Sequence, residues 1–534
     1  MKKLYALLTI VFFLSGFAFA QHYSEVDQHF GDDNDADVTQ TGTDQFSDID
    51  QGGDNNQATV LQEQVEHNSW IAQFGDDNDA NVHQRGHHNE SHILQTFEGN
   101  DADVFQHGGH NDSWIMQEDD YNNADVHQGG RDNFSDIWQT GSGQNNDANV
   151  RQHGRWNDSW VSQHGTDNDA DVIQSNRFNF STSYQEGDNN DAYVEQYAFS
   201  GHSDINQYGD NNDAQVLQDG IGAEFLASFI DQDGDGNNAD VDQGGFLGAF
   251  QLSDIVQYGD DNDADVLQRG FSQTSWIEQG LFVEGENNNA QVDQDGAFHF
   301  SYIVQQRDGN DAEVFQRDFD QWSWVVQDGD NNNAGVYQFG ATNTSVVAQG
   351  GYYTGGYRGG VIFLEDENDN DAEVLQVGAV NYSVVNQYGS GNNTDVQQWI
   401  VGNYSWAEAS GDDNNADVIQ IGFINASDLF QSGDDNNADV FQIVEGNYSY
   451  ASQSGDDNNA DIGQGGFYNW SDLIQSGDNN DADVIQVGAI NYSFVGQGGN
   501  DNNSDVYQEG VGNVSFESQM GDNGSISVSQ IFWP

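Results

Sequence analysis

The sequence predicts an all-β fold: a β-solenoid of about 22 stacked rungs, each made of strand, turn, strand and turn. Two observations lead to this prediction. Gln recurs every eleven residues, and within each eleven-residue arm the residue types alternate with a period of two, as in a strand. A third observation is the Gly, Asp and Asn residues between the arms, which are typical of tight turns.

The start of the sequence has the features of a secretory signal peptide. Lys2 and Lys3 precede an apolar run from Leu4 to Phe17, and small residues lead to a cleavage point after Ala20. We therefore expect a signal peptide over residues 1–20 and a secreted protein, located outside the cell or on its surface. The alternative is a transmembrane helix, for which the apolar run is short.

The composition excludes several classes of protein. Asp and Glu total 90 against 11 Lys and Arg, which gives a formal net charge of -79, and the chain has no Cys. So acidic a surface disfavours a nucleic-acid partner, and the lack of Cys excludes disulfides and thiolate metal sites. Disorder is disfavoured, because 12% of the residues are aromatic.

The rest of the chain, residues 21–534, is a single repeat of arms that alternate between two types. We call them Ala arms, such as residues 31–40, and Ser arms, such as residues 111–117, after the residue four positions before the Gln. One rung therefore spans 22 residues, and stacking lets each rung bury a face that it could not bury alone. We read five insertions as loops at rung edges, the largest near residues 350–367 and the others near residues 141–144, 220–226, 245–250 and 281–286.

The inward face of the arms carries amides as well as small apolar residues. A buried amide without hydrogen-bond partners is costly, but stacking in parallel and in register lets each amide bond the same amide one rung away. The pattern therefore predicts continuous ladders in a cross-β, amyloid-like arrangement. The expected ladder residues begin with Asn34, Gln40, Gln51, Asn56, Gln62, Asn78, Gln84, Asn100 and Gln106.

The outward face of the Ala arms carries acidic residues three positions before the Gln. Stacking places neighbouring carboxylates about 4.8 Å apart, so they repel one another. One interpretation is a solvated stripe that keeps the chain soluble; the other is bridging by Ca²⁺ or Mg²⁺. We assign no firm metal site, and the candidates are Asp37, Asp103, Asp171, Asp265, Asp417, Asp439, Asp461 and Asp483.

The equivalent outward position of the Ser arms carries an aromatic stripe, formed by Trp70, Trp114, Trp160, Trp276, Trp324 and Trp406. These side chains could pack filaments side by side or stack on the rings of a matrix polysaccharide. Alternatively, they only stabilise the sheet through contacts with neighbouring strands. The pattern shows no catalytic constellation, so we expect neither an enzyme nor a cofactor beyond the possible Ca²⁺.

One half-repeat resembles a known family. Residues 73–84 have the form Q-x-G-x-x-N-x-A-x-x-x-Q, which is similar to the curlin repeat of bacterial curli subunits. The resemblance implies a subunit that self-assembles into extracellular amyloid fibres of the biofilm matrix, with a nucleator subunit and an outer-membrane secretion channel as partners. The expected function is therefore a secreted structural subunit for biofilm matrix and adhesion. The alternative is a surface adhesin that does not polymerise and binds carbohydrate or divalent cations through its regular outer faces.

Overall fold

The computed structural model describes residues 22–141, 143–221, 224–246, 250–280, 285–353, 361–363 and 368–532. Over these ranges the regular elements are strands, which confirms the all-β prediction. No helix in the described ranges is long and apolar enough to cross a membrane. The expected signal peptide, with its cleavage point after Ala20, lies outside the described residues.

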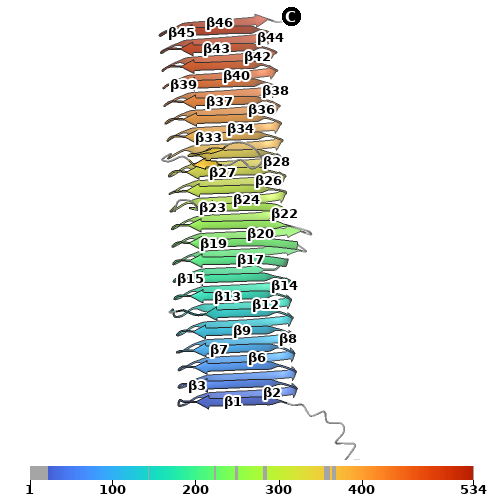
Figure 1. Ribbon diagram of the computed structural model, residues 1–534. Coiled ribbons are helices and arrows are strands. Elements are labelled where there is room, and N and C mark those ends of the chain that lie inside the picture. Colours follow the sequence, from blue (N-terminus) through green and yellow to red (C-terminus); the bar gives the residue numbers. More distant parts are fainter. Residues whose placement is uncertain are drawn as a thin grey trace, which may run out of the picture. The chain divides into compact units, whose positions relative to one another are not determined.

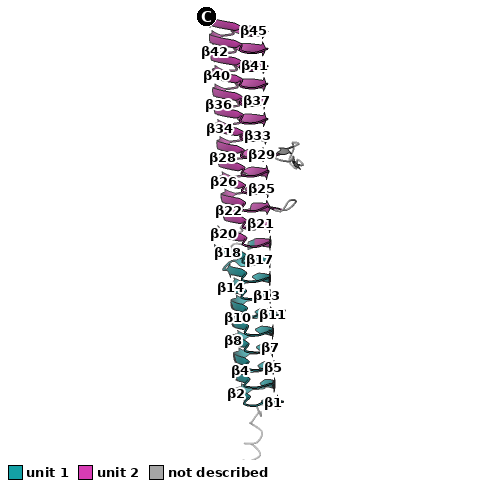
Figure 2. Cartoon of the chain, turned by 90° about the vertical axis from the view of Figure 1, so that its left-hand side faces the viewer, with its two compact units in different colours: residues 1–226 teal, residues 227–534 magenta. Residues whose placement is uncertain are grey.

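The chain forms two compact units, Met1–Leu226 and Ala227–Pro534, which are coloured separately in Figure 2. Each unit is a β-solenoid of stacked rungs, with one Ala-arm strand and one Ser-arm strand in each rung. Of the described strands, 44 belong to the repeat, which corresponds to about 22 rungs. The predicted fold class is therefore confirmed.

Unit 1 contains nine strands of each type in its described part. The Ser-arm strands are β1 (Tyr23–His29), β3 (Phe46–Gly52), β5 (Asn68–Phe74), β7 (Glu90–Thr96), β9 (Asp112–Glu118), β11 (Phe134–Gln139), β13 (Asp158–His164), β15 (Phe180–Glu186) and β17 (Phe199–Tyr208). The Ala-arm strands are β2 (Asp35–Thr43), β4 (Gln57–Val65), β6 (Asp79–His87), β8 (Asp101–Gly109), β10 (Asn123–Arg131), β12 (Asp147–Arg155), β14 (Asp169–Arg177), β16 (Asp191–Gln196) and β18 (Asp213–Ile221).

In sequence, unit 2 begins within β19 (Glu224–Asp233), a Ser-arm strand. Its Ala-arm strands are β20 (Asn238–Phe246), β22 (Asp263–Phe271), β24 (Asn289–Ala297), β26 (Asp311–Phe319), β28 (Asn333–Ala341), β32 (Asp371–Ala379), β34 (Asn393–Val401), β36 (Asn415–Phe423), β38 (Asn437–Glu445), β40 (Asn459–Phe467), β42 (Asp481–Ala489), β44 (Asn503–Val511) and β46 (Ser525–Phe532). Its Ser-arm strands are β21 (Gln251–Tyr258), β23 (Gln273–Gln279), β25 (Phe300–Gln306), β27 (Trp322–Asp328), β29 (Thr344–Gln349), β33 (Tyr382–Tyr388), β35 (Tyr404–Ser410), β37 (Ala426–Ser432), β39 (Tyr448–Ser454), β41 (Trp470–Ser476), β43 (Tyr492–Gly498) and β45 (Val514–Met520).

The strands of each unit pair in parallel with the equivalent strand of the next rung, as Figure 1 shows for the stacked arrows of unit 1. In the pair β2–β4, Ala36 lies opposite Ala58 and Val38 opposite Val60. The register is maintained because a slip of one residue would turn every inward residue outward. The expected parallel, in-register pairing is confirmed.

Small apolar side chains fill the space between the Ala-arm strands and the Ser-arm strands. Ala80 and Val82 of an Ala arm and Ile93 of a Ser arm are each at most 2% exposed. Because these side chains are small, two sheets can approach to about 10 Å. The core therefore continues from rung to rung in each unit.

The repeat register continues across the insertions near residues 141–144, 281–286 and 350–367. Asn123 pairs with Asp147, Ala264 with Ala290 and Ala334 with Ala372, each across an insertion. In the largest insertion, β30 (Gly351–Tyr353) and β31 (Val361–Phe363) pair antiparallel, and β30 lies against β27, β29 and β33. Much of the predicted loops, namely residues 142, 222–223, 247–249, 281–284, 354–360 and 364–367, lies outside the described residues.

Candidate functional surface

The Gln residues at the arm ends form ladders of side-chain hydrogen bonds. In unit 2, Nε2 of Gln420 donates to Oε1 of Gln442, and Nε2 of Gln442 donates to Oε1 of Gln464, both at 2.8 Å. Each Nε2 also reaches a backbone carbonyl, which for Gln442 is that of Ala426 at 2.9 Å. All three Gln side chains are buried, so these bonds satisfy amides that water cannot reach.

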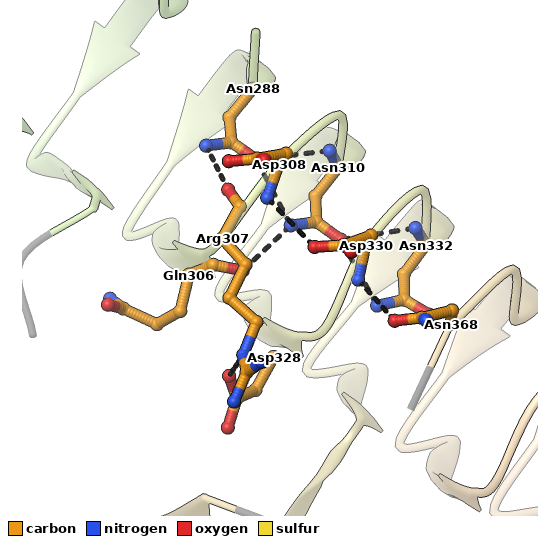
Figure 3. Close-up of polar contacts among 9 residues, drawn as sticks. All are labelled: Asn288, Gln306, Arg307, Asp308, Asn310, Asp328, Asp330, Asn332 and Asn368. Atoms are coloured by element: carbon orange, nitrogen blue, oxygen red, sulfur yellow. Dashed lines mark hydrogen bonds and ion pairs between the residues drawn. The ribbon is translucent and has the colours of Figure 1, made fainter. Parts of the chain in front are cut away.

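The Asn residues at the turns form a second kind of ladder, shown in Figure 3. Oδ1 of Asn288 accepts the backbone N–H of Asn310 at 3.0 Å and its side-chain N–H at 3.1 Å, and Asn310 does the same for Asn332. The sequence predicted amide-to-amide bonds alone. The backbone bond is additional, because Asn is short enough for its oxygen to face the main chain of the next turn.

The expected ladder residues of unit 1 lie in three such columns. One runs through Gln40, Gln62, Gln84 and Gln106, the second begins at Gln51, which bonds Gln73, and the third runs through Asn34, Asn56, Asn78 and Asn100. Asn34 and Gln40 are half-buried, and the other members of these columns are buried.

Two further ladders were not expected from the sequence. At the turns, the backbone N–H of Asp412 donates to Oδ1 of Asp434 at 3.0 Å, and the same bond recurs one rung later. On the outward face, Nδ2 of Asn393 donates to Oδ1 of Asn415 at 2.8 Å, and that row continues through Asn437 and Asn459. The Asn-Asn pairs at consecutive arm starts were the signal that could have revealed the outer row.

The candidate carboxylates are not all neighbours. Asp417, Asp439, Asp461 and Asp483 lie opposite one another on four consecutive rungs of unit 2. Of the other candidates, Asp103 pairs with Asp125 and Asp265 with Asp240, while Asp37 faces Thr59 and Asp171 lies between Asn149 and Tyr193. The longest acidic column is therefore in the second half of unit 2.

A second acidic column lies two residues earlier on the same face and raises the charge density. It contributes Asp101 and Asp169 in unit 1. Partial burial, followed by repulsion from nearby carboxylates, raises the pKa of both to about 6. In unit 2 the same causes raise the pKa of Asp395 and Asp483 to about 6. These columns thus favour protonation well above the usual range of an Asp.

These pKa shifts predict a fold that is more stable in mild acid. Between about pH 4 and pH 6 the folded chain holds protons that the unfolded chain has released, so the free energy of unfolding falls as pH rises through this window. We expect the midpoint of thermal unfolding, followed by circular dichroism, to be about 5 °C or more higher at pH 4.5 than at pH 7.5.

Five buried or partly buried histidines have the opposite effect on the pH dependence of stability, because burial lowers their pKa and acid must charge them. They are His67, His107, His127, His202 and His299. Shifted carboxylates are far more numerous over the described ranges, so we expect them to dominate. A midpoint that rises steadily from pH 4.5 to pH 7.5 would contradict this prediction.

The described residues offer no preformed metal centre. Within them, no three or more His, Asp or Glu side chains are grouped so that they could hold a metal ion. Stacked pairs such as Asp417 and Asp439 still bring two carboxylates together, which is the arrangement that bridging by Ca²⁺ would use.

The six candidate Trp residues face outward but do not stack on one another as one row. In unit 1, the His92 ring stacks between Trp70 and Trp114, with ring centroids 4.3 Å and 4.1 Å away, and Trp160 lies 5.7 Å from Phe134. Trp114 and Trp160 are 46% and 50% exposed. These rings support the sheet and still present apolar surface.

In unit 2 the aromatic stripe is partly covered. Trp276 is 39% exposed and contacts Tyr302 edge to face. Trp324 and Trp406 instead pack against the buried cluster of Val346, Ala348 and Val384. This cluster occupies strands β29 and β33, against which β30 lies, and the two Trp side chains are half-buried.

Comparison with known protein families supports these assignments. Nine segments match the curlin associated repeat, and they fall in both units: residues 75–108, 143–175, 165–197, 259–296, 368–398, 411–443, 433–466, 455–488 and 477–510. A search of the curated proteins found no significant match. The matched segments contain Ala arms, turns and members of both kinds of ladder, such as Asn78, Gln84 and Gln442. The repeats of this chain match the curlin repeat family.

Proposed function

We propose that the chain is a secreted structural subunit that self-assembles into extracellular, curli-like amyloid fibres of the biofilm matrix, where it also serves adhesion. The observation that supports this most directly is the repetition of the inward residues: Ala, Val and Gln recur in the same register from rung to rung within each unit. The edge of any rung is therefore complementary to the edge of any other, and unpaired strand edges are sites for adding strands.

The ladders give such assembly a direction. In Gln420, Gln442 and Gln464, each Nε2 donates towards the following rung and each Oε1 accepts from the preceding one. The Asn ladder runs the other way, since Asn310 donates to Asn288 in the preceding rung, so the two edges of a rung offer different sets of donors and acceptors that complement each other. We therefore propose that copies add head to tail, in the parallel orientation already present within each unit.

Secretion, partners and the lack of catalysis follow from the same proposal. A signal peptide over residues 1–20 would direct export, and the family resemblance suggests a nucleator subunit and an outer-membrane channel. A stack of ladders is a scaffold rather than a catalytic centre, so we propose a structural, non-enzymatic role. The acidic surface leaves nucleic acid outside the proposed partners.

Assembly can be tested on purified residues 21–534 at neutral pH. We expect thioflavin fluorescence to rise after a lag, preformed fibres to remove the lag, and fibre diffraction to give a meridional reflection at about 4.7–4.8 Å. A folded β-rich monomer that does not grow even when seeded would instead favour an adhesin that binds carbohydrate or divalent cations without polymerising. The exposed surfaces of Trp114 and Trp160 would suit that role.

Calcium provides a second prediction. Stacked carboxylates repel one another by about 0.9 kcal/mol per pair in water before screening, and a bridging cation would remove this cost. At low ionic strength we expect about 1 mM Ca²⁺ to shorten the lag of assembly severalfold. The control is NaCl at matched ionic strength; an equal effect of NaCl would assign the change to screening and contradict bridging.

A further inference from the structure

The rungs of unit 2 contain an open groove of about 520 Å³, a size typical of small-ligand sites. Its lining comes from three neighbouring rungs, at the turn that precedes the Ser-arm strands. The lining residues are Ser272, Thr274, Phe298, His299, Phe300, Phe319, Asp320 and Trp322.

Aromatic side chains on both sides of the turn line the groove. On one side, Phe298 and Phe319 meet edge to face with ring centroids 5.3 Å apart, and they are 43% and 49% exposed. On the other side, the Phe300 and Trp322 rings lie 5.2 Å apart at an angle of 34°. Aromatic surface on both sides of one groove can bury the flat apolar faces of a ligand.

A buried histidine between these aromatic residues has an unused nitrogen. His299 is 2% exposed and takes the place of a ladder amide, which in the next rung is Gln321. Its Nε2 lies 3.2 Å from the carbonyl oxygen of Asp295, an acceptor, so Nε2 carries the proton and Nδ1 presents a lone pair. Nδ1 has no hydrogen-bond partner, and neither has Oε1 of Gln321. Both atoms are closed to solvent, so a ligand in the groove does not reach them and must find its polar partners elsewhere in the lining.

Polar groups at the groove restrict the charge of such a ligand. The indole N–H of Trp322 donates to Oδ1 of Asp320 at 3.0 Å, which fixes this carboxylate at the groove while Oδ2 can accept a further bond. Burial lowers the pKa of His299, so its ring is neutral, although the nearby Asp295, Asp318 and Asp320 oppose this shift. Three carboxylates on a chain of net charge -79 repel acidic ligands and favour neutral or cationic ones.

We propose that this groove binds hexose rings of a polysaccharide that is uncharged or carries amino groups. A pyranose ring has a C–H face that the aromatic side chains can cover and a rim of hydroxyls that can donate to Asp320. An amino group on the sugar would add an ion pair with Asp320. The groove belongs to one chain, so this proposal does not depend on fibre assembly.

The test is isothermal titration of purified residues 21–534 with three hexamers: β-1,4-glucose, β-1,4-glucosamine and the anionic galacturonic acid. We expect the first two to bind and the third not to bind. Trp322→Ala should weaken binding at least about tenfold, and Asp320→Asn should remove any preference for glucosamine. His299→Asn restores the residue that most rungs carry, as at Asn343, and His299 is buried, so the fold should be retained and the affinity should change little.

The matched control is Trp470→Ala, since Trp470 also begins a Ser-arm strand and is 48% exposed but lies outside the groove. This variant should bind like the unchanged chain. Equal loss in Trp470→Ala, binding of galacturonate alone, or no binding by any hexamer would each overturn the proposal. Binding to dispersed chains but not to fibres would show that a second copy occupies the groove, and would overturn it as well.

Discussion

Replacing Gln442 with Leu is expected to lower the free energy of unfolding by about 2–4 kcal/mol, because it breaks a fully buried ladder. Oε1 of Gln464 loses its donor from the preceding rung, and Gln420 loses its acceptor in the following one. The carbonyl of Ala426 loses a donor as well. Leu fills a similar volume, so the loss reports the unsatisfied amides rather than a cavity.

This result can be measured as a shift in the midpoint of urea unfolding, with Gln291→Leu as the matched control. Gln291 is an exposed, outward residue of β24, and its replacement should change the midpoint little. Hydrogen exchange should localise the loss of protection to β36, β38 and β40, because each rung contacts only its neighbours. Equal midpoints for the two variants would mean that the ladders contribute no net stability.

Gly466→Ala is expected to destabilise the chain by about 4 kcal/mol through two effects of the added methyl group. Gly466 has a φ of +117°, which side-chain-bearing residues rarely adopt. A Cβ there would also overlap the backbone carbonyl oxygen of Gly488 in the next rung. Since the overlapping atom belongs to the main chain, it cannot move without disturbing the register of β40 and β42.

The control for this prediction lies in the same strand. Gly463→Ala would place its Cβ 3.9 Å from a side-chain carbon of Ile485, an ordinary contact, so we expect it to be neutral or to stabilise by a few tenths of a kcal/mol. Thermal unfolding of the two variants, followed by circular dichroism, compares them directly. Similar losses for both would show that strand propensity, rather than the close approach of turns, makes Gly necessary at residue 466.

Much of the fold could be predicted from the sequence because the same residue pattern recurs from rung to rung. The alternation in Asn34, Ala36, Val38 and Gln40 defines an inward face, and a 22-residue period places the same residues opposite one another. Register and burial follow from these two facts. The Gln ladders follow as well, since a buried amide in register has its counterpart in the next rung as the nearest partner.

Other features depend on distances that a pattern does not contain. Oδ1 of Asn288 accepts the backbone N–H of Asn310 as well as its side-chain N–H, because the short Asn side chain lies close to the next turn, a distance that the sequence does not contain. Whether Trp324 and Trp406 form an open stripe depends on how they pack against the cluster of Val346, Ala348 and Val384. The Asp pKa values depend likewise on how deeply each carboxylate is buried among its neighbours.

The sequence by itself therefore determined the class of fold, the rung period, the inward residues and the resemblance to the curlin repeat. The reason is that each of these features follows from a short sequence pattern that recurs about 22 times along the chain. Only the tertiary structure decided the outer Asn row, the turn ladders of Asp412 and Asp434, and the groove around His299. Each of these arises where side chains from different rungs meet, and their distances and burial are set by stacking rather than by position in the repeat.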